Sequence, residues 1–476
     1  MRPEETFQAL WERGMKDTTT RSDYREAIKL LDAFINMERS VPSTAFFRNG
    51  GERMRQLLQR AGQPQLGIPA VHIAGTKGKG SVAGLAGAAL AANGFKTGVY
   101  TSPHVGNLRE RIAVNGSPVS ERAFAEAADD VLREASAMRD EGLPPSYFEI
   151  LTVIALSAFQ AAGAEVIFLE AGLGGRLDAT NLLPDLRLAA VGLTPISMDH
   201  EDILGHSLTE IATEKVEIIH PRIPVVTAPQ APDVARLIAR TASRRDARLF
   251  AVGEDIKFET TRKRQPDKPE LGQRVNFETW RNVYLDITLS MLGEHQVENA
   301  ALALGLAELL LEYMDREPLD SLVLKRAWRG LAFPARLEVA GRSPWMIVDG
   351  AHNPASAWAA AETLPAAFAA RDRTMVFGVA RDKNWRAMLR ILVPLFQNVI
   401  LSPYDSPRAV DTAELAGFMG REFSGIKTAE ALDISHALAM ARDSFTPADG
   451  LIFVTGSLYL AGEALAVIRR GRSERA

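Results

Sequence analysis

The segment GTKGKGS at 75–81 contains the residue types that bind phosphate. Its glycines permit positive φ and let a ligand approach the backbone closely; they are Gly75, Gly78 and Gly80. A predicted strand ends at Ala74 and a predicted helix begins near Lys79, so the helix N-terminus would direct backbone N–H groups at an anion. The Lys79 ammonium adds positive charge, and the Ser81 hydroxyl could reach a magnesium ion bound to the phosphate.

The spacing differs from the usual G-x-x-x-x-G-K-[ST] pattern, because Gly80 separates Lys79 from Ser81. A purely structural turn between strand and helix is the alternative interpretation. The strand–turn–helix context favours nucleotide binding over it. The predicted nucleotide-binding residues of this segment are Gly75, Thr76, Lys77, Gly78, Lys79, Gly80 and Ser81.

The elements that must position this loop follow a βαβ rhythm, in which short apolar runs alternate with longer helical patterns. Buried strands are predicted at 71–75, 96–102, 166–172, 188–193 and 224–228. Helices are predicted at 81–93, 120–139, 149–162, 208–219, 231–243, 294–313 and 318–328. The rhythm restarts after 331, with apolar runs in WMIVDG, TMVFGV, NVILSP and LIFVTG.

This pattern predicts an α/β protein with two domains. Residues 1–330 form a mostly parallel-sheet domain with a helical lead-in over about the first 65 residues, and 331–476 form a smaller Rossmann-like α/β domain. The polar stretch at 255–290 predicts a β-rich excursion with an exposed loop.

Composition excludes several classes of protein. The chain has 476 residues, a formal charge of −4 and no cysteine. The charge argues against nucleic-acid binding, and the absence of cysteine excludes disulfides, thiolate catalysis and Cys-based metal sites. The first residues do not resemble a secretory signal, and no apolar run approaches the roughly 20 residues that span a bilayer. We therefore expect a cytoplasmic protein without nucleic-acid or membrane partners.

A family resemblance begins at the glycine-rich segment. GTKGKGS resembles the phosphate loop of the Mur ligase superfamily, and TSPHVGNLRERIAVNG at 101–116 is similar to a segment of its folylpolyglutamate synthase/dihydrofolate synthase branch. Further motifs resemble that branch in the same order: EAGLGGRLDATN at 170–181, LTPISMDHEDILG at 193–205, EKVEII at 214–219, FPARLEVAG at 333–341 and DGAHNP at 349–354. The similarity spans about residues 24 to 460.

The resemblance implies a P-loop Mur-ligase-type central domain followed by a Mur-ligase-type C-terminal domain. It also implies an enzyme of folate biosynthesis and one-carbon metabolism that uses ATP and Mg²⁺. The implied reaction adds L-glutamate to dihydropteroate or a reduced folate through an acyl phosphate, and releases ADP and phosphate. We expect a monomer with two magnesium sites, and a monovalent cation site is compatible with this scheme.

The implied metal ligands are Ser81, Ser102, Glu170, His200 and Lys215. Hard oxygen donors suit magnesium, whereas histidine is a less usual ligand, so His200 rests on the resemblance. In the family the lysine that matches Lys215 is carbamylated, which turns a cation into an oxygen ligand. Here Val216-Glu217 replaces the family's Ala-Gly after that lysine, which leaves the local packing and the carbamylation open. A lone helical lysine is otherwise usually a solvated charge.

The remaining implied residues contact the nucleotide or the other substrates. Those for the nucleotide are Asn299, Arg336 and Asp349. Those for glutamate or the phosphorylated intermediate are His352, Asn353 and Lys383, with His352 also expected, with Lys79 and Lys215, to be catalytic. Those for the pterin are Phe148, Glu149, Arg176, Asp178 and Asn181. For several of these a structural role is the alternative, since Phe148 could be core and DGAHNP is also good turn and helix-start sequence.

Other functions remain open at this stage. A different Mur-superfamily amino-acid ligase would share the acyl-phosphate route, although TSPH and the Phe-Glu segment argue against it. A nucleotide-binding homologue with impaired catalysis would be compatible with the altered EKVEII motif. A general P-loop NTPase would explain only the loop. Nothing in the motifs decides between dihydropteroate and a reduced folate as the acceptor, or determines the length and linkage of the polyglutamate.

Overall fold

The computed structural model describes residues 23–36, 49–262 and 272–473, and the chain divides into two compact units. The first unit comprises Met1–His104, Leu108–Asp255 and Leu302–Leu319. The second comprises Val105–Asn107, Ile256–Ala301 and Asp320–Ala476. The sequence predicted a single boundary at 330. The division into units is different in kind, because it assigns 256–301 to the second unit, so the boundary at 330 stays a prediction.

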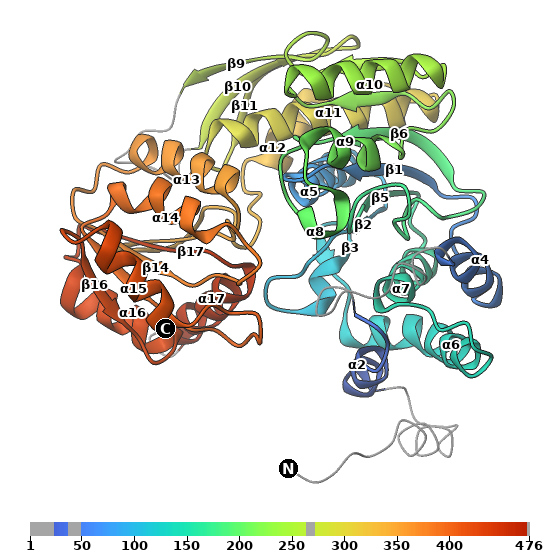
Figure 1. Ribbon diagram of the computed structural model, residues 1–476. Coiled ribbons are helices and arrows are strands. Elements are labelled where there is room, and N and C mark those ends of the chain that lie inside the picture. Colours follow the sequence, from blue (N-terminus) through green and yellow to red (C-terminus); the bar gives the residue numbers. More distant parts are fainter. Residues whose placement is uncertain (1–22, 37–48, 263–271, 474–476) are drawn as a thin grey trace. The chain divides into compact units, whose positions relative to one another are not determined.

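The first unit is built on a mixed sheet with the strand order β4-β3-β2-β5-β1-β6-β7-β8 in the described part of the chain (Figure 1). The strands β2, β5, β1, β6, β7 and β8 are parallel to one another. Beyond β2, β3 and β4 extend the sheet as an antiparallel edge. The strands are β1 (Pro69–Ala74), β2 (Thr97–Tyr100), β3 (Ile112–Val114), β4 (Ser117–Pro118), β5 (Val166–Glu170), β6 (Arg187–Leu193), β7 (Val225–Thr227) and β8 (Leu249–Ala251). Because β1, β5 and β6 are neighbours, the loops that follow them meet at one edge of the sheet.

Helices cover this sheet, and α5 packs on β1, β2 and β5. The helices of the first unit are α2 (Tyr24–Asp32), α4 (Gly50–Arg60), α5 (Lys79–Ala92), α6 (Glu121–Asp140), α7 (Tyr147–Ala162), α8 (Glu201–Leu204), α9 (Leu208–Val216) and α10 (Pro232–Arg244). A 3₁₀ turn, η1 (Leu108–Arg111), precedes β3. Helix α11 (Glu294–Tyr313) has residues in both units.

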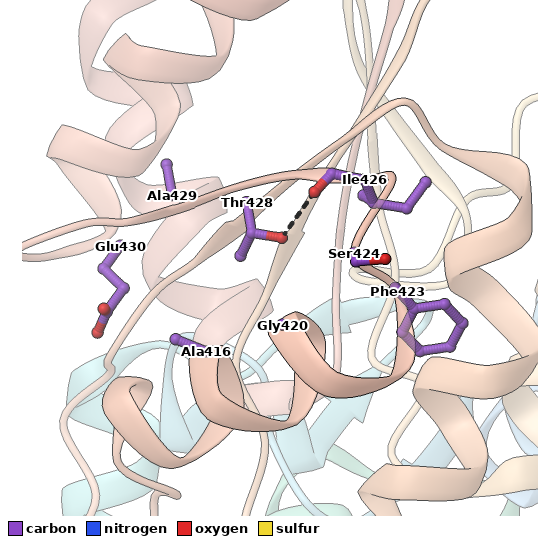
Figure 2. Close-up of a pocket in the computed structure, with 8 residues that line it drawn as sticks. All are labelled: Ala416, Gly420, Phe423, Ser424, Ile426, Thr428, Ala429 and Glu430. Carbon is purple, nitrogen blue, oxygen red and sulfur yellow. Dashed lines mark hydrogen bonds between the residues drawn. The ribbon is translucent and has the colours of Figure 1, made fainter.

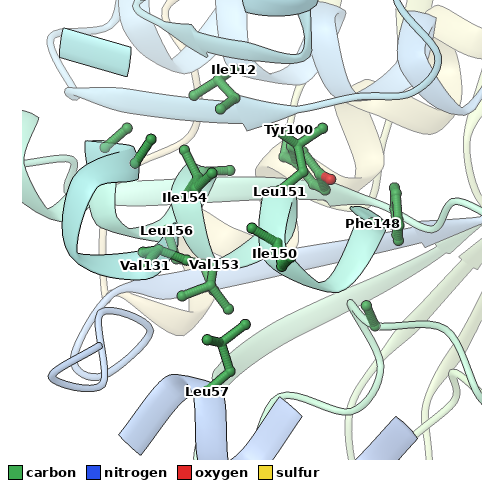
Figure 3. Close-up of a cluster of buried hydrophobic side chains, with 14 of the residues drawn as sticks. Leu57, Tyr100, Ile112, Val131, Phe148, Ile150, Leu151, Val153, Ile154 and Leu156 are labelled. Atoms are coloured by element: carbon green, nitrogen blue, oxygen red, sulfur yellow. The ribbon is translucent and has the colours of Figure 1, made fainter. Parts of the chain in front are cut away.

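Helix α7 shows how the sequence specifies one element and its burial. A capping box between Ser146 and Glu149 begins the helix, and Gly163 ends it with φ of 69°. Between them the helix is apolar on nearly every side, which is typical of a fully buried helix. Figure 3 shows its side chains in a cluster with Leu57 of α4 and Val131 of α6. The same cluster includes Ile167 and Leu169, so α7 shares its core with β5.

The second unit contains two sheets within its described residues. A three-stranded antiparallel sheet has the order β11-β10-β9, from β9 (Lys257–Arg262), β10 (Gln273–Glu278) and β11 (Val283–Leu289). A six-stranded sheet has the order β12-β13-β17-β14-β15-β16, with only β12 antiparallel to its neighbour. Its strands are β12 (Glu338–Arg342), β13 (Trp345–Val348), β14 (Arg373–Phe377), β15 (Asn398–Leu401), β16 (Lys427–Glu430) and β17 (Leu451–Thr455).

The helices of the second unit alternate with the strands of the six-stranded sheet, apart from α12. They are α12 (Ser321–Trp328), α13 (Pro354–Ala367), α14 (Trp385–Leu392), α15 (Thr412–Glu422), α16 (Ile434–Met440) and α17 (Leu458–Ser473), with short turns η3 (Val393–Leu395) and η4 (Ala441–Phe445). Strand β17, the last in the chain, lies between β13 and β14. The carboxyl ends of β13, β17 and β14 therefore lie side by side. Residue 349, directly after β13, and residue 455, at the end of β17, are thus neighbours at this edge although they are far apart in the chain.

The expected architecture is confirmed: a mostly parallel α/β domain precedes a smaller α/β domain. The β-rich excursion at 255–290 is also present as β9, β10 and β11, while its predicted exposed loop falls partly on 263–271, outside the described residues. Of the predicted helical lead-in, the structure contains α2 and α4. Residues 1–22 and 37–48 lie outside the described ranges. Within those ranges, no helix combines the length and apolar character needed to cross a bilayer.

Candidate functional site

The glycine-rich segment forms a loop between β1 and α5, as its sequence predicts. Gly75 and Gly78 have φ of 142° and 85°, values that favour glycine. A Cβ at Gly75 would lie 2.8 Å from the carbonyl oxygen of Thr194, so no larger residue fits there. No side chain caps the N-terminus of α5, whose first residue is Lys79. The loop thus leaves backbone N–H groups at a helix start for an anionic ligand.

Glu170 faces this loop from the end of β5. Its Oε1 lies 3.6 Å from Lys79 Nζ, and its Oε2 accepts the Ser102 backbone N–H at 3.1 Å. A Cβ at Gly80 would lie 3.0 Å from the same Oε2. Strands β1, β2 and β5 therefore bring together Lys79, Ser102 and Glu170, which the sequence predicted from separate motifs.

These groups fit a magnesium ion, since a buried carboxylate and nearby hydroxyls are hard oxygen donors. Glu170 and Ser81 are 4% and 3% exposed. His200, by contrast, is exposed at the start of α8, with φ of 53° and its N–H bonded to Asp199 Oδ1. Among the described residues, no group of three or more His, Asp or Glu side chains is arranged to hold a metal. The assignment of His200 as a ligand stays a prediction.

Lys215 is buried behind the phosphate loop rather than solvated. It is 4% exposed, and its Nζ donates to the Gly75 carbonyl oxygen at 2.9 Å. Burial, with a smaller contribution from the positive charge of Lys79, lowers the pKa of Lys215 to about 7. A large fraction of the amine is then unprotonated near neutral pH. An unprotonated amine is the form that carbamylation requires.

The departure from the family pattern after Lys215 is accommodated by local packing. Val216 is buried in the core of the first unit, and Glu217 Oε2 pairs with Arg245 Nη2 at 2.5 Å. Gly175 packs directly against the carbonyl groups of Glu214 and Lys215, where a Cβ would lie 2.6 and 3.0 Å from the two oxygens. Both residues that depart from the family pattern therefore have partners within the first unit.

The glycine-rich turn at 172–181 is held by its own polar side chains. Arg176 pairs with Glu214 of α9 at 2.9 Å. Asp178 is buried, and its carboxylate accepts the N–H groups of Leu173 at 2.7 Å and Thr180 at 3.0 Å. Burial raises the pKa of Asp178. Asn181 Oδ1 lies 2.9 Å from the Nε2 of His220. The three predicted pterin residues of this turn thus have structural partners, and their contact with substrate stays a prediction.

Phe148 and Glu149 separate into two different environments. The Phe148 ring lies against Gly172 at the start of the turn, where a Cβ would be 2.5 Å from the ring. Glu149 is 5% exposed and receives both Arg53 Nε and Nη2 at 2.8 Å. It also accepts the Ser146 N–H at 2.7 Å. Phe148 is therefore placed under the turn, whereas the carboxylate of Glu149 is used by α4 and by the capping box.

In the second unit, Arg336 lies in a strained segment organised by Asp349. Ala335 and Leu337 have φ of 51° and 48°, a left-handed conformation that is unfavourable for residues with a Cβ. Asp349 accepts the N–H groups of Leu337 and Ala351, both at 2.8 Å. Burial raises the pKa of Asp349, and Arg336 opposes that shift. Asp349 thus joins the PAR and DGAHNP segments and presents Arg336.

The DGAHNP loop ends β13 and begins α13. The Nδ1 of His352 lies 2.8 Å from the Gly350 carbonyl oxygen, and Asn353 caps α13 by accepting the Ser356 N–H. The Lys383 side chain is largely buried, with its Nζ 3.9 Å from Asp382. Asn299, on α11, is also buried and donates to Gln296 Oε1 at 3.1 Å.

Sequence reasoning missed residues that follow β17 and β15, of which those after β17 lie beside this loop. The Gly456 N–H donates to the Ala351 carbonyl oxygen at 3.0 Å, which places Ser457 beside DGAHNP. After β15, Arg408 pairs with Asp382 at 2.6 Å. These residues follow parallel strands, the position where α/β sheets bind ligands. That signal was present in LIFVTGS and NVILSPY, although neither segment revealed which strands are neighbours.

A separate depression of about 340 Å³ lies between α15 and the edge strand β16. Figure 2 shows its lining, which is mostly apolar or small and includes one charged side chain, Glu430. None of the predicted site residues lines it. We therefore do not assign the predicted chemistry to this depression.

Comparison with known proteins matches most of the chain to two domain families. Residues 73–307 match the Mur ligase middle domain, and residues 335–458 match the Mur ligase glutamate ligase domain. The dihydrofolate synthase/folylpolyglutamate synthase of Mycobacterium tuberculosis is 34% identical over 446 residues, covering 88% of this chain and 90% of that protein. That of Bacillus subtilis is 32% identical, covering 86% of this chain and 93% of its own length. The structure of the M. tuberculosis folylpolyglutamate synthase complexed with ADP has a TM-score of 0.81 at 31% identity, covering 94% and 98%.

Proposed function

Because the chain belongs to the folylpolyglutamate synthase/dihydrofolate synthase family of Mur ligases, we propose that it is an ATP-dependent ligase that joins L-glutamate to a folate-type carboxylate. The acceptor is dihydropteroate, a reduced folate or both. Both molecules carry a flat ring system and a carboxylate. The observation that most directly supports this proposal is the burial of Lys215 against the Gly75 carbonyl oxygen, directly behind the phosphate loop.

The reaction needs the acceptor carboxylate to be activated before the amine can attack it. A carboxylate oxygen attacks the γ-phosphorus of ATP, ADP leaves, and an acyl phosphate forms. The amine of glutamate then attacks the acyl carbon, and the tetrahedral intermediate expels phosphate while the nitrogen loses a proton. The protein must neutralise phosphate charge, align the reactants and exclude water.

The residues of the first unit suit the phosphoryl half of this reaction. The N–H groups of the 75–81 loop and Lys79 would hold the phosphates. Magnesium, when bound, supplies charge neutralisation on the phosphates, and Glu170, Ser81 and Ser102 are the oxygen groups that would hold it. His200 and Lys215 would hold a second magnesium if Lys215 is carbamylated; the carbamate would form when the neutral Nζ adds to carbon dioxide and loses a proton.

The residues of the second unit suit the nucleotide and the amino acid. Arg336 would bind phosphate oxygens through its planar guanidinium, and the strained backbone on either side supports a functional role. His352 and Asn353, which follow β13, would bind glutamate or the phosphorylated intermediate. Lys383, which follows β14, would bind the same substrates. Ser457 joins this set because β17 lies beside β13.

The first test is phosphate release from ATP by the purified chain with magnesium, bicarbonate and glutamate. Dihydropteroate, tetrahydrofolate and no acceptor are compared, and we expect release with at least one acceptor. Lys79→Ala should abolish it, whereas Lys96→Ala, an exposed lysine in the same unit, should leave it unchanged. No stimulation by either acceptor would shift the assignment to another amino-acid ligase or to a nucleotide-binding homologue with impaired catalysis.

Carbamylation of Lys215 has its own test. The protein is incubated with bicarbonate labelled with carbon-13, and the spectrum should contain a carbamate carbon that Lys215→Gln removes. A wild-type spectrum without this signal would leave Lys215 as a buried amine bonded to Gly75, and the second magnesium site would lose one ligand.

A further inference from the structure

The four residues that follow β6, 194–197, are hydrogen-bonded to the phosphate loop, and we call them the brace. Strand β6 lies between β1 and β7 in the sheet. On the β1 side, the Thr194 N–H donates to the Ala74 carbonyl oxygen at 2.9 Å. The Thr76 N–H donates to the Pro195 carbonyl oxygen at 3.0 Å. Pairing between these two segments therefore continues past the ends of β1 and β6 and into the phosphate loop.

The side chain of Thr76 is bonded to the same segment. Its Oγ1 accepts the Ser197 N–H at 3.0 Å and donates to the Ser197 carbonyl oxygen, also at 3.0 Å. A threonine hydroxyl has a single proton, and the Ser197 carbonyl oxygen receives it here. Both donors of Thr76, the N–H and the hydroxyl, are thus used by the brace, and neither is directed at a phosphate oxygen.

Gln230 holds the brace from the β7 side. Its Oε1 accepts the Ile196 N–H at 3.0 Å, and its Nε2 donates to the Thr194 carbonyl oxygen at 3.1 Å. The same Nε2 lies 3.3 Å from the hydroxyl of Thr227, the last residue of β7. One amide therefore satisfies a donor and an acceptor of the brace and joins them to the neighbouring strand.

The phosphate loop needs such support because of its composition. It contains Gly75, Gly78 and Gly80, which give its backbone more freedom than other residues would. Its N–H groups bind an anion only when they converge on it. In a loop that samples several shapes, the dissociation constant rises as the fraction of molecules with the right shape falls. The bonds from the brace to residues 74 and 76 lie on both sides of Gly75 and restrict the first half of the loop.

We propose that Thr76 and Gln230 are positioning residues for the nucleotide: they hold the brace from two sides, and the brace keeps the first half of the phosphate loop in the shape that receives phosphate. Neither side chain touches the nucleotide. The inference rests on one part of the proposed function, the binding of ATP by this loop. It requires neither the acceptor nor turnover.

The alternative is that the Thr76 hydroxyl contacts the nucleotide directly and that Gln230 only stabilises its own turn. The two explanations differ in the protein without nucleotide. A positioning role predicts that loss of either side chain loosens the brace before any ligand binds. A direct contact predicts that Thr76 matters only in the complex and that Gln230 does not affect nucleotide binding.

The experiment measures the Kd of the full chain for ADP with magnesium by titration calorimetry. Thr76→Val is nearly isosteric and removes the hydroxyl. We expect it to raise the Kd about tenfold, the effect of lost hydrogen bonds that leave about one molecule in ten with a competent loop. Thr76→Ser keeps the hydroxyl and should stay within about threefold of the wild type. Thr209→Val, which changes an exposed threonine of the same unit, is the matched control.

Gln230→Met provides the second variant, and it carries the test if Thr76→Val does not fold. Its side chain bonds to Ile196, Thr194 and Thr227, so a change in ADP binding cannot come from a lost nucleotide contact. We expect the Kd for ADP to rise at least about threefold. Gln59→Met, which replaces an exposed glutamine of α4, should bind ADP as the wild type does.

Hydrogen exchange of the nucleotide-free protein provides the independent readout. The Ser197 amide should be protected in the wild type, should exchange at least about tenfold faster in Thr76→Val and should be protected again in Thr76→Ser. Weak ADP binding by Thr76→Val with unchanged exchange at Ser197, or wild-type ADP binding by Gln230→Met, would refute the positioning role. Absence of phosphate release with every acceptor would refute the proposed ligase function, and the ADP and exchange measurements would still decide this inference.

Discussion

Gly175→Ala should damage catalysis through the backbone alone. Gly175 lies where the glycine-rich turn crosses the last turn of α9. An added Cβ would be 2.6 Å from the Glu214 carbonyl oxygen, 3.0 Å from that of Lys215 and 3.1 Å from Ile218 Cγ2. Two of these three atoms belong to the backbone of a helix end, so they cannot rotate away as a flexible side chain would.

The size of the losses in stability and in kcat depends on the backbone atoms that the added Cβ would push aside. Overpacking of this kind costs about 1–3 kcal/mol, which for a unit of this size lowers the unfolding temperature by roughly 2–12 °C. The helix end carries Lys215, whose Nζ is bonded to Gly75 of the phosphate loop. A misplacement of about 1 Å in a reacting geometry can cost about a hundredfold in rate, so we expect kcat to fall at least about tenfold.

The assay pairs steady-state phosphate release with thermal unfolding of the same preparations. The matched control is Gly330→Ala, where an added Cβ meets no atom within 4 Å, and it should behave as the wild type. Gly175→Ala with wild-type kcat and an unfolding temperature within about 1 °C of the wild type would refute the reasoning, because the turn and α9 would then tolerate a methyl group that the structure has no room for.

Three further predictions concern stability and the second unit. Arg53→Met leaves the Glu149 carboxylate buried without its guanidinium partner, and should cost about 3–5 kcal/mol in urea unfolding; a loss below about 1 kcal/mol would contradict the buried ion pair. The pKa of His72 falls from its ordinary value of 6.5 to about 3 on folding, so the unfolded chain binds the extra proton between these values. Stability should therefore decrease as pH falls from about 6.5 towards 3, by up to about 1.4 kcal/mol per pH unit, and His72→Gln should remove this component from the unfolding midpoints. Arg336→Lys loses the planar fork and should raise the KM for ATP by about tenfold with the unfolding temperature unchanged, and an unaltered KM would argue against a phosphate contact.

Much of the first unit could be predicted from local pattern. The strand before Gly75, the helix from Lys79 and the strand that ends at Glu170 were visible because apolar runs and glycines mark the ends of buried parallel strands. Since such strands place their carboxyl ends on one edge, Glu170 and the phosphate loop could be expected near each other. The fold class and the family likewise followed from the order of the motifs along the chain.

Some environments depended on partners distant in the chain. The carboxylate of Glu149 is occupied by Arg53, 96 residues away, which no local pattern indicates. The burial of Lys215 also exceeded what its helix predicts, because it depends on a contact with Gly75, 140 residues away. The environment of His72 likewise depends on Thr180, 108 residues away, whose hydroxyl lies 2.7 Å from the histidine Nε2.

The sequence by itself determined the elements, the phosphate loop, the two α/β regions and the chemistry available at each motif. Only the tertiary structure decided which motifs share an environment: that β17 lies between β13 and β14 and so brings Ser457 to DGAHNP, and that the 172–181 turn rests on both Phe148 and α9. The physical reason is that periodicity and turn residues are set by neighbours along the chain. Strand order, burial and the pKa values that follow from burial are set by neighbours in space.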